Sequence, residues 1–304
     1  AWPLPPSASD VVPGSGELDR FVDAVRDHAP LVVLTGAGLS AASGIPTYRN
    51  DRGEWQRSDP IQHQEFIRRA DMRRRYWARS LVGWRPVQRA KPNPAHRALA
   101  DLEELGCIEL LVTQNVDRLH QRAGSRRVVD LHGRLDRLLC RGCGATIPRA
   151  TFQEELLECN PRVASTSAAL RPDGDAEVSD RLVDGFHVPD CRRCGGMIMP
   201  DVVFFGGTVR RERVDRVRSA IDRAGALLVV GSSLMVYSGF RFCRQVAAAE
   251  KPLLIVNRGT TRADDLASVK LQADGAEVLC ALRNRLQAAP PLRQASPATL
   301  EAGL

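Results

Sequence analysis

Lysine is almost missing from this chain of 304 residues. Of its 43 lysine and arginine residues only three are lysines, which leaves 40 arginines. The arginines are spread among 36 acidic residues, and the densest group, Arg73–Arg75 with Arg68 and Arg69, forms one local helical patch. A nucleic-acid-binding chain concentrates its basic residues on one face or stripe. The excess of arginine over lysine is therefore more typical of a GC-rich coding genome than of a nucleic-acid surface, and with a net charge of +7 we expect no specific nucleic-acid partner.

Long apolar runs are also missing. No run approaches the ~18 residues that a membrane-spanning helix needs, so we expect no membrane partner. Residues 1–15 have no basic stretch followed by an apolar core, so they do not form a secretory signal. Their Pro, Ser and Gly content predicts a disordered leader, and the Ala/Pro-rich residues 288–304 predict a disordered tail. We therefore expect a cytoplasmic protein whose unpaired cysteines, Cys107, Cys159, Cys243 and Cys280, are reduced and buried.

What the sequence does contain is a series of short, wholly apolar segments. They lie at residues 31–35, 108–113, 227–230 and 252–256. Continuous apolar strands are typical of a parallel sheet that is covered on both faces. Helical patterns at 17–29, 95–105 and 211–224 alternate with these strands. The sequence predicts an α/β fold with a Rossmann-like, doubly wound parallel sheet.

Each of these strands is followed by small or amide residues. The four strand ends carry Gly36-Ala-Gly38, Gln114-Asn115, Gly231-Ser-Ser233 and Asn257. Any one of them could be an ordinary turn, but in open α/β sheets ligands bind beyond the carboxyl ends of the strands. The four ends together therefore predict one shared ligand crevice.

The first strand end also fits a phosphate-binding pattern. Residues 36–41 match G-x-G-x-x-G/A, in which glycines let backbone N–H groups approach a pyrophosphate. Asp51 and Glu54 lie near the position of a dehydrogenase's acidic residue, but no strand pattern precedes them. A polar loop, residues 43–49, comes there instead. The pattern indicates a dinucleotide ligand without the geometry of a hydride-transferring enzyme.

Four of the eight cysteines form two pairs with metal-ligand spacing. Cys140 and Cys143 make one C-x2-C pair, Cys191 and Cys194 make the other, and 47 residues separate the pairs. Two such pairs predict a tetrahedral Zn(II) site, and four thiolates leave no coordination position open for catalysis. We therefore expect one structural zinc ion.

Two segments interrupt the α/β alternation, and we interpret both as insertions that build a smaller zinc-binding and helical lobe. They span residues 51–92 and 136–199. The Rossmann-like lobe then comprises residues 16–50, 93–135 and 200–285. His132 lies where the chain passes from one lobe to the other, so it is a candidate general base, although a lone histidine is often structural.

These motifs together resemble the signature set of the sirtuins, a family of NAD-dependent protein-lysine deacylases. The resemblance spans residues 16–285 as a single catalytic domain, and the ordered set of motifs carries it: residues 36–49, 113–117, 131–133, the four paired cysteines, 231–233 and 256–257. Within the family the chain looks most like a bacterial member of the class II branch, of the mitochondrial sirtuin-four type. Segments 60–63, 75–84, 91–96, 123–127, 201–206 and 261–266 indicate that branch.

The resemblance implies NAD as co-substrate and His132, Asn115 and Asp117 as catalytic residues. His132 would act as the general base, Asp117 would hold the nicotinamide carboxamide, and Asn115 would order water and the ribose. The acyl group would leave lysine for ADP-ribose with release of nicotinamide. The implied cofactor-binding residues are Gly36, Ala37, Gly38, Ser40, Pro46, Tyr48, Arg49, Gln114, Asn115, Asp117, Gly231, Ser232, Ser233, Asn257, Arg258, Gly259 and Gly275.

The implied partner is an acyl-lysine peptide that lies extended between the lobes. Residues 203–206 and 235–238 would offer strand edges to it, and we expect one of Phe204 and Phe205 to be core and the other to face the cleft. The implied substrate-binding residues are Tyr76, Arg79, Val203, Phe204, Phe205, Gly206 and Val236. The family usually has an acid where this chain has Gly207.

Tyr76 and Arg79 share one helix face, and in the class II branch such a pair lines the acyl pocket. A phenol and a guanidinium suit an acyl chain that ends in a carboxylate. Arg79 could instead be a solvated member of the Arg73–Arg75 patch. We expect a preference for longer or acidic acyl groups over acetyl.

Two other functions remain open from the sequence. One is an NAD-dependent protein ADP-ribosyltransferase, which would use the same cofactor residues. The other is a zinc-ribbon binding module joined to a nucleotide sensor, which would not need His132, Asn115 and Asp117 in one cleft.

Overall fold

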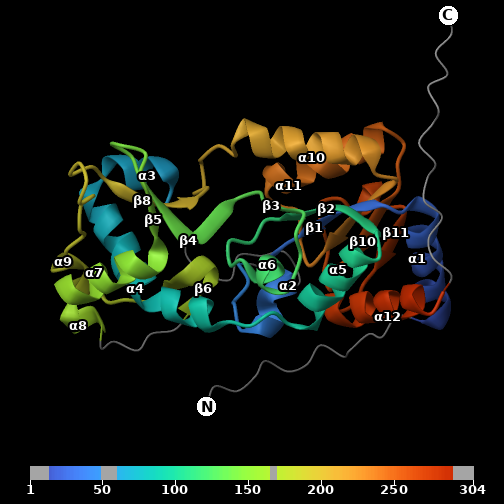
Figure 1. Ribbon diagram of the computed structural model, residues 1–304, viewed down its shortest axis with the longest axis horizontal. Helices are drawn as coiled ribbons and strands as arrows, with labels where there is room; N and C mark the ends of the chain where they lie inside the picture. Colours follow the sequence, from blue (N-terminus) through green and yellow to red (C-terminus); the bar gives the residue numbers. More distant parts are fainter. Residues whose placement is uncertain (1–13, 49–59, 165–169, 290–304) are drawn as a thin grey trace, which may run out of the picture.

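The computed structural model describes residues 14–48, 60–164 and 170–289. A large lobe built on a parallel sheet and a smaller lobe of helices and antiparallel strands lie side by side (Figure 1). The fold class predicted from the sequence is confirmed. Residues 1–13 of the predicted leader, residues 290–304 of the predicted tail and Arg49 lie outside the described residues. The leader prediction was wrong at its end, because Ser15 is already the first residue of a helix, Ser15–His28, with Gly14 as its N-cap. The exact bounds of the two lobes stay a prediction.

The large lobe contains a six-stranded sheet in the order β11-β10-β9-β1-β2-β3. All neighbouring strands in it are parallel. The strands are β1 (Leu31–Thr35), β2 (Ile108–Thr113), β3 (Val128–Asp130), β9 (Ala226–Val230), β10 (Leu253–Val256) and β11 (Val269–Leu271). From β1 the chain first builds outward through β2 and β3, and later builds in the opposite direction through β9, β10 and β11. The loops after β1 and β9 therefore diverge at a topological switch point.

Helices cover both faces of this sheet (Figure 1). One layer consists of α1 (Ser15–His28), α5 (Pro94–Glu104) and α12 (Gly275–Gln287), and the other of α10 (Arg211–Arg223) and α11 (Tyr237–Ala248). Side chains alternate across a strand, so Val33 packs into the first layer and Val32 into the second. Such two-sided burial explains why the strands are apolar throughout.

Two of these helices begin at side-chain caps. The Asn93 side chain accepts hydrogen bonds from the backbone N–H groups of Ala95 and His96, and Pro94 is the first residue of α5. The Asp274 side chain caps α12 in the same way. A cap and a proline at the first helical position both favour a helix start at that point.

The small lobe packs two helices of one insertion against a three-stranded antiparallel sheet of the other. The helices are α3 (His63–Arg68) and α4 (Ala70–Arg89), and the sheet consists of β4 (Gly133–Cys140), β5 (Thr146–Pro148) and β8 (Ile198–Val202) in the order β5-β4-β8. Its core includes Trp77, Phe66, Phe152 and Leu138. The lobe also contains α7 (Arg149–Cys159), α8 (Pro161–Ala164), α9 (Asp180–Asp184) and a small hairpin of β6 (Leu170–Arg171) and β7 (Asp175–Ala176).

Short helical turns complete the described chain. They are α2 (Ala37–Ser40), α6 (Leu119–Arg122) and three 3-10 turns at Ala41–Ser43, Pro172–Gly174 and Asp264–Leu266. Within the described ranges, no helix combines the length and the apolar character that a membrane crossing requires.

The burial predicted for the unpaired cysteines is correct in part. Cys107 and Cys243 are buried and Cys280 is half-buried, but Cys159 is exposed. Cys159 is the last residue of α7, and this helix buries its opposite face, which includes Phe152 and Leu156. The prediction for Cys159 was therefore wrong.

Two buried histidines pack against each other, with tilted rings, behind the loop that follows β1. The rings of His96 on α5 and His120 on α6 lie 4.8 Å apart, and His120 Nε2 lies 2.9 Å from Thr35 Oγ1. Burial lowers the pKa of His96 to about 4, and burial together with the neighbouring His96 lowers the pKa of His120 well below its ordinary value. Both rings are therefore neutral in the folded protein at neutral pH.

This pair makes the stability of the protein sensitive to acid. The unfolded chain binds protons at histidine with a pKa of about 6.5, while the folded chain does so only near pH 4 at His96 and well below pH 6.5 at His120. Below about pH 6.5 the unfolded state binds more protons than the folded state. The free energy of unfolding should therefore decrease as the pH is lowered, by up to about 1.4 kcal/mol per pH unit for each histidine. Urea unfolding of wild type and of His120→Gln between pH 4.5 and 7.5 checks this. The variant should show a shallower pH dependence, whereas parallel curves would contradict the assignment.

Candidate active site and metal centre

A cavity lies where strands β1, β2, β9 and β10 of the sheet end. Its volume is about 720 Å³, and both lobes contribute to its wall. The residues predicted at the four strand ends line it together: Gly36, Ala37, Gly38, Gln114, Asn115, Gly231, Ser232, Ser233 and Asn257. The structure therefore brings the four strand ends into one crevice, at the switch point of the sheet.

The floor of the cavity is made by two backbones in close contact. The Gly38 N–H group donates a 2.9 Å hydrogen bond to the Gly231 carbonyl. A Cβ atom at Gly36 would lie 2.7 Å from Ser232 Cβ, and one at Gly38 would lie 2.9 Å from Gly231 O. Side chains are thus excluded at both glycines, which leaves a small-residue cradle of the kind that admits a pyrophosphate.

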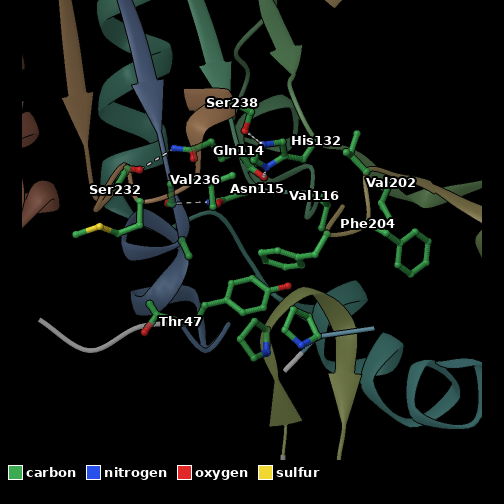
Figure 2. A pocket seen from close by; sticks show the side chains of 18 of the residues that line it. Thr47, Gln114, Asn115, Val116, His132, Val202, Phe204, Ser232, Val236 and Ser238 are labelled. Atoms are coloured by element: carbon green, nitrogen blue, oxygen red, sulfur yellow. Dashed lines mark hydrogen bonds between the residues drawn. The ribbon is translucent and has the colours of Figure 1, made fainter. Parts of the chain in front are cut away.

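Amide side chains fix the neighbouring strand end. Gln114 Nε2 donates a 2.7 Å hydrogen bond to Ser232 Oγ (Figure 2). Asn115 Nδ2 donates 3.0 Å bonds to Gly36 O and Ser40 Oγ. These bonds connect the ends of β1, β2 and β9. The cavity wall is therefore held in place before any ligand binds.

Asp117 lies beneath the wall of the cavity rather than in it. It is buried, accepts a 2.7 Å hydrogen bond from Ser40 Oγ, and accepts a second from the backbone N–H group of Leu119. Burial raises the pKa of its carboxyl group. In this structure Asp117 orients Ser40, which in turn accepts from Asn115.

His132 presents one nitrogen to the cavity in a defined protonation state. Its Nδ1 lies 3.0 Å from the Gln114 carbonyl, which can only accept, so Nδ1 carries the proton. Nε2 is then unprotonated and accepts a 2.7 Å hydrogen bond from Ser238 Oγ (Figure 2). Burial, together with the charges of Arg213 and Arg241, lowers the pKa of His132 to about 4 although the Gln114 carbonyl opposes this. A neutral imidazole with an unprotonated nitrogen can take up a proton.

Not all predicted cofactor residues line the cavity. Pro46 and Tyr48 do, but Ser40, Arg258, Gly259 and Gly275 do not. Arg258 forms an exposed ion pair with Asp274, and the Gly259 carbonyl accepts a hydrogen bond from Asn257. Gly275 begins α12 and approaches Val230.

All the predicted substrate-binding residues do line the cavity. Phe204 belongs to the small-lobe core, where its ring centroid lies 4.8 Å from that of Phe66, and Phe205 contacts Tyr48 at the cavity edge. The expected division between a core and a cleft phenylalanine is thus observed, although Phe204 reaches the cavity too. The predicted edge at 235–238 was partly wrong, because α11 begins at Tyr237 and uses the backbone of Tyr237 and Ser238 for its first turn.

Arg79 is not part of a solvated arginine patch. Only 8% of this residue is exposed, and its guanidinium group forms an ion pair with Asp175 and donates to the Ala176 carbonyl. Tyr76 lies in the same wall and packs against Phe204.

Several residues that the structure places in the site were not predicted from the sequence. Ser238, the partner of His132, lay in a segment interpreted as strand edge. Arg171, Pro172 and Asp175 line the cavity from the middle of an insertion whose Ser, Ala and Pro content gave no signal for a site. The one local signal is at residues 171–175, where charged residues lie beside a proline and a glycine, a pattern typical of a turn.

The four paired cysteines converge at the end of the small lobe. Cys140 ends β4, Cys143 lies in the turn to β5, and Cys191 and Cys194 precede β8. Their Sγ atoms all lie within 4.8 Å of one another, with Cys140 and Cys194 at 3.4 Å and Cys143 and Cys191 at 3.9 Å. Zn–S bonds of about 2.3 Å in a tetrahedron place sulfurs about 3.8 Å apart, so the set fits a Zn(II) ion.

The fold and the site together define a class of enzyme. Its large α/β lobe has the features of a dinucleotide-binding site and a neutral histidine at the cavity, and its small lobe has a four-cysteine metal site. Residues 36–238 match the Sir2 family model. The chain is 53% identical over 249 residues to an NAD-dependent protein deacetylase of Bordetella bronchiseptica, covering 82% of this chain and 91% of the relative.

Two further comparisons agree. The chain is 48% identical over 266 residues to the NAD-dependent protein lipoamidase sirtuin-4, mitochondrial, of Bos taurus, covering 86% of this chain and 84% of the relative. A solved structure of Sir2Tm bound to a propionylated peptide superposes with a TM-score of 0.70 at 31% identity, covering 90% of this chain and all of that chain. The chain belongs to the Sir2 family, the sirtuins. These relatives support NAD as its co-substrate, and the cysteine geometry supports the zinc site.

We expect one zinc ion per chain, bound by the four thiolates. Because metal binding is coupled to folding of such a site, Cys191→Ala should lose the metal together with solubility or thermal stability. Metal analysis of purified wild type and variant, with Cys159→Ala as the control for an exposed thiol outside the cluster, checks the expectation. Active protein without zinc would contradict it.

Proposed function

We propose that the protein is an NAD-dependent protein-lysine deacylase that transfers an acyl group from lysine to ADP-ribose and releases nicotinamide. The observation that carries this proposal is the neutral His132, whose unprotonated Nε2 faces a cavity that also contains the glycine cradle and Tyr76 with Arg79. One cavity thus offers a place for a nucleotide, a base and an acyl chain.

The nucleotide would occupy the part of the cavity between the strand ends. Gly36, Ala37, Gly38 and Ser232 would hold its phosphates, and Asn257 would hold the adenosine ribose. NAD would supply the ADP-ribosyl group that accepts the acyl group, nicotinamide would be the leaving group, and one water molecule would be consumed to release free lysine. Asp117 would act mainly through Ser40 and Asn115, because its carboxylate is buried behind them.

His132 would take up a ribose hydroxyl proton at Nε2. Ser238 Oγ holds that position in this structure, so the substrate hydroxyl would replace the serine as hydrogen-bond donor. The Gln114 carbonyl keeps Nδ1 protonated and would stabilise the imidazolium that forms. Arg213 and Arg241 disfavour the imidazolium, so the proton would be released readily after the reaction.

The acyl-lysine peptide would lie extended between residues 203–206 and Val236. Backbone pairing of this kind tolerates many sequences. The acyl chain would enter the wall formed by Tyr76 and Arg79, and we propose that longer or acidic acyl groups are removed better than acetyl. The 48% identity to a protein named as a lipoamidase supports a long acyl pocket.

Incubation with NAD and a panel of acyl-lysine peptides tests the function. Nicotinamide release with formation of free lysine and O-acyl-ADP-ribose supports a deacylase. Nicotinamide release with an ADP-ribosylated protein and an unchanged acyl-lysine would instead indicate an ADP-ribosyltransferase.

His132→Ala should lower turnover by the ~10²- to 10⁴-fold typical of a lost general base. NAD binding should persist, because the phosphate cradle lies on other strand ends. Since the pKa of His132 is about 4, the ring is neutral across pH 6–8, and kcat/KM should show no loss of this base near pH 6.5. Near-full activity in the variant would make His132 merely structural.

Arg79→Met should lower activity on glutaryl-lysine much more than on acetyl- or lipoyl-lysine. The methionine keeps an unbranched apolar chain but removes the donors that a terminal carboxylate needs. Comparison of kcat/KM on the three peptides measures the effect. An equal loss on all three would show that Arg79 supports the fold through Asp175 instead.

A further inference from the structure

A hairpin from the second insertion carries an acid to the acyl-chain end of the cavity. Strands β6 and β7 pair through Arg171 and Asp175, and both residues line the cavity together with Arg79. Arg79 forms an ion pair with the Asp175 carboxylate and donates a 3.3 Å hydrogen bond from Nε to the Ala176 carbonyl. The residue that would bind an acidic acyl group thus already holds a carboxylate of its own chain.

The hairpin is positioned by close packing against α4. A Cβ atom at Gly83 would lie 2.4 Å from the Gly174 carbonyl oxygen, so only glycine lets the turn lie against the helix. Gly83 is one turn beyond Arg79 on α4, and Asp175 follows Gly174 directly. The other Asp175 carboxylate oxygen accepts a 2.8 Å hydrogen bond from the Ala176 N–H group. The ion pair is therefore part of a packed interface rather than a contact between two mobile side chains.

This arrangement changes what Arg79 can offer to a substrate. Its positive charge is compensated, and a terminal carboxylate on an acyl chain would bring a second negative charge beside Asp175. Two carboxylates at one guanidinium repel each other, and burial, which raises the pKa of Asp175, makes the added charge more costly. A neutral acyl chain meets no such repulsion and can pack along Tyr76 and Leu135.

We propose that Asp175 is a specificity-determining residue that competes with acidic acyl groups for Arg79, so that the wild-type protein favours long neutral acyl chains over acidic ones. The proposal rests on the proposed deacylase function and names the substrate class of the same site. Arg79 remains the anion-binding group, and Asp175 sets how much of that affinity a substrate can use.

Asp175→Asn in the full chain tests this, because asparagine keeps the shape of the side chain and the bond to the Ala176 N–H group while it removes the charge. We expect kcat/KM for glutaryl-lysine peptide to rise on the order of 10-fold, the scale of one charge-assisted interaction, with lipoyl-lysine changed by less than about 2-fold. The gain should disappear in the double variant Arg79→Met/Asp175→Asn, because the two residues act on each other. Asp184→Asn, an exposed acid of the same insertion, is the matched control and should not change the ratio.

Direct binding of the two peptides separates this proposal from the deacylase proposal. If wild type cleaves no acyl-lysine peptide, the deacylase function fails, while the ratio of the two peptide affinities still decides the role of Asp175. An unchanged glutaryl-to-lipoyl ratio in Asp175→Asn overturns the proposal, as does an equal loss on both peptides. Should that variant be unstable, Asp175→Ser, which removes the same charge and keeps a side-chain oxygen near the Ala176 N–H group, must raise the same ratio.

Discussion

The structure depends on one close contact between two backbones, that of the loop after β1 with that of the loop after β9. Gly38 donates to the Gly231 carbonyl, and no side chain fits between them. The contact fixes the position of the turn from β1 into α2. It therefore also fixes the position of Ser40, which forms hydrogen bonds with Asn115 and Asp117. It also fixes Ser232, which Gln114 holds, and the Gln114 carbonyl determines the tautomer of His132. The chemistry of the base is thus linked to the glycine cradle through a chain of hydrogen bonds.

A cluster of charges joins the two lobes near this site. Asp201 on β8 is 5% exposed and forms ion pairs with Arg137 of the small lobe and with Arg210 and Arg213, at the start of α10. A buried acid that lost these partners would be costly, so the cluster favours one arrangement of the lobes. Arg213 also disfavours protonation of His132, which places the cluster within electrostatic reach of the base.

The parts of this molecule that could be predicted from sequence are those that local chemistry alone determines. Apolar runs predicted β1, β2, β9 and β10, and cysteine spacing predicted the metal cluster, because both patterns have few physical alternatives. Strands β3 and β11 are only three residues long and carry too little pattern.

The position of a side chain relative to the cavity was less predictable. Asp117 was expected to touch the cofactor, but its carboxylate bonds to Ser40 and Leu119 behind the wall. Asp175 could not be chosen at all, because its role depends on a contact between a hairpin and a helix 96 residues away in sequence. Such contacts are long-range, and no local pattern encodes them.

Strands β4 and β8 extend from the metal site at one end to the cavity at the other. Strand β4 begins directly after His132 and contributes its last residue, Cys140, to the metal site. Strand β8 begins after the loop that contains Cys191 and Cys194, and Val203 follows its last residue. The two paired strands connect the thiolates to the cleft. Removal of the metal would therefore inhibit the enzyme from a distance, lowering the maximal rate at any concentration of nucleotide, and added NAD would not reverse the loss.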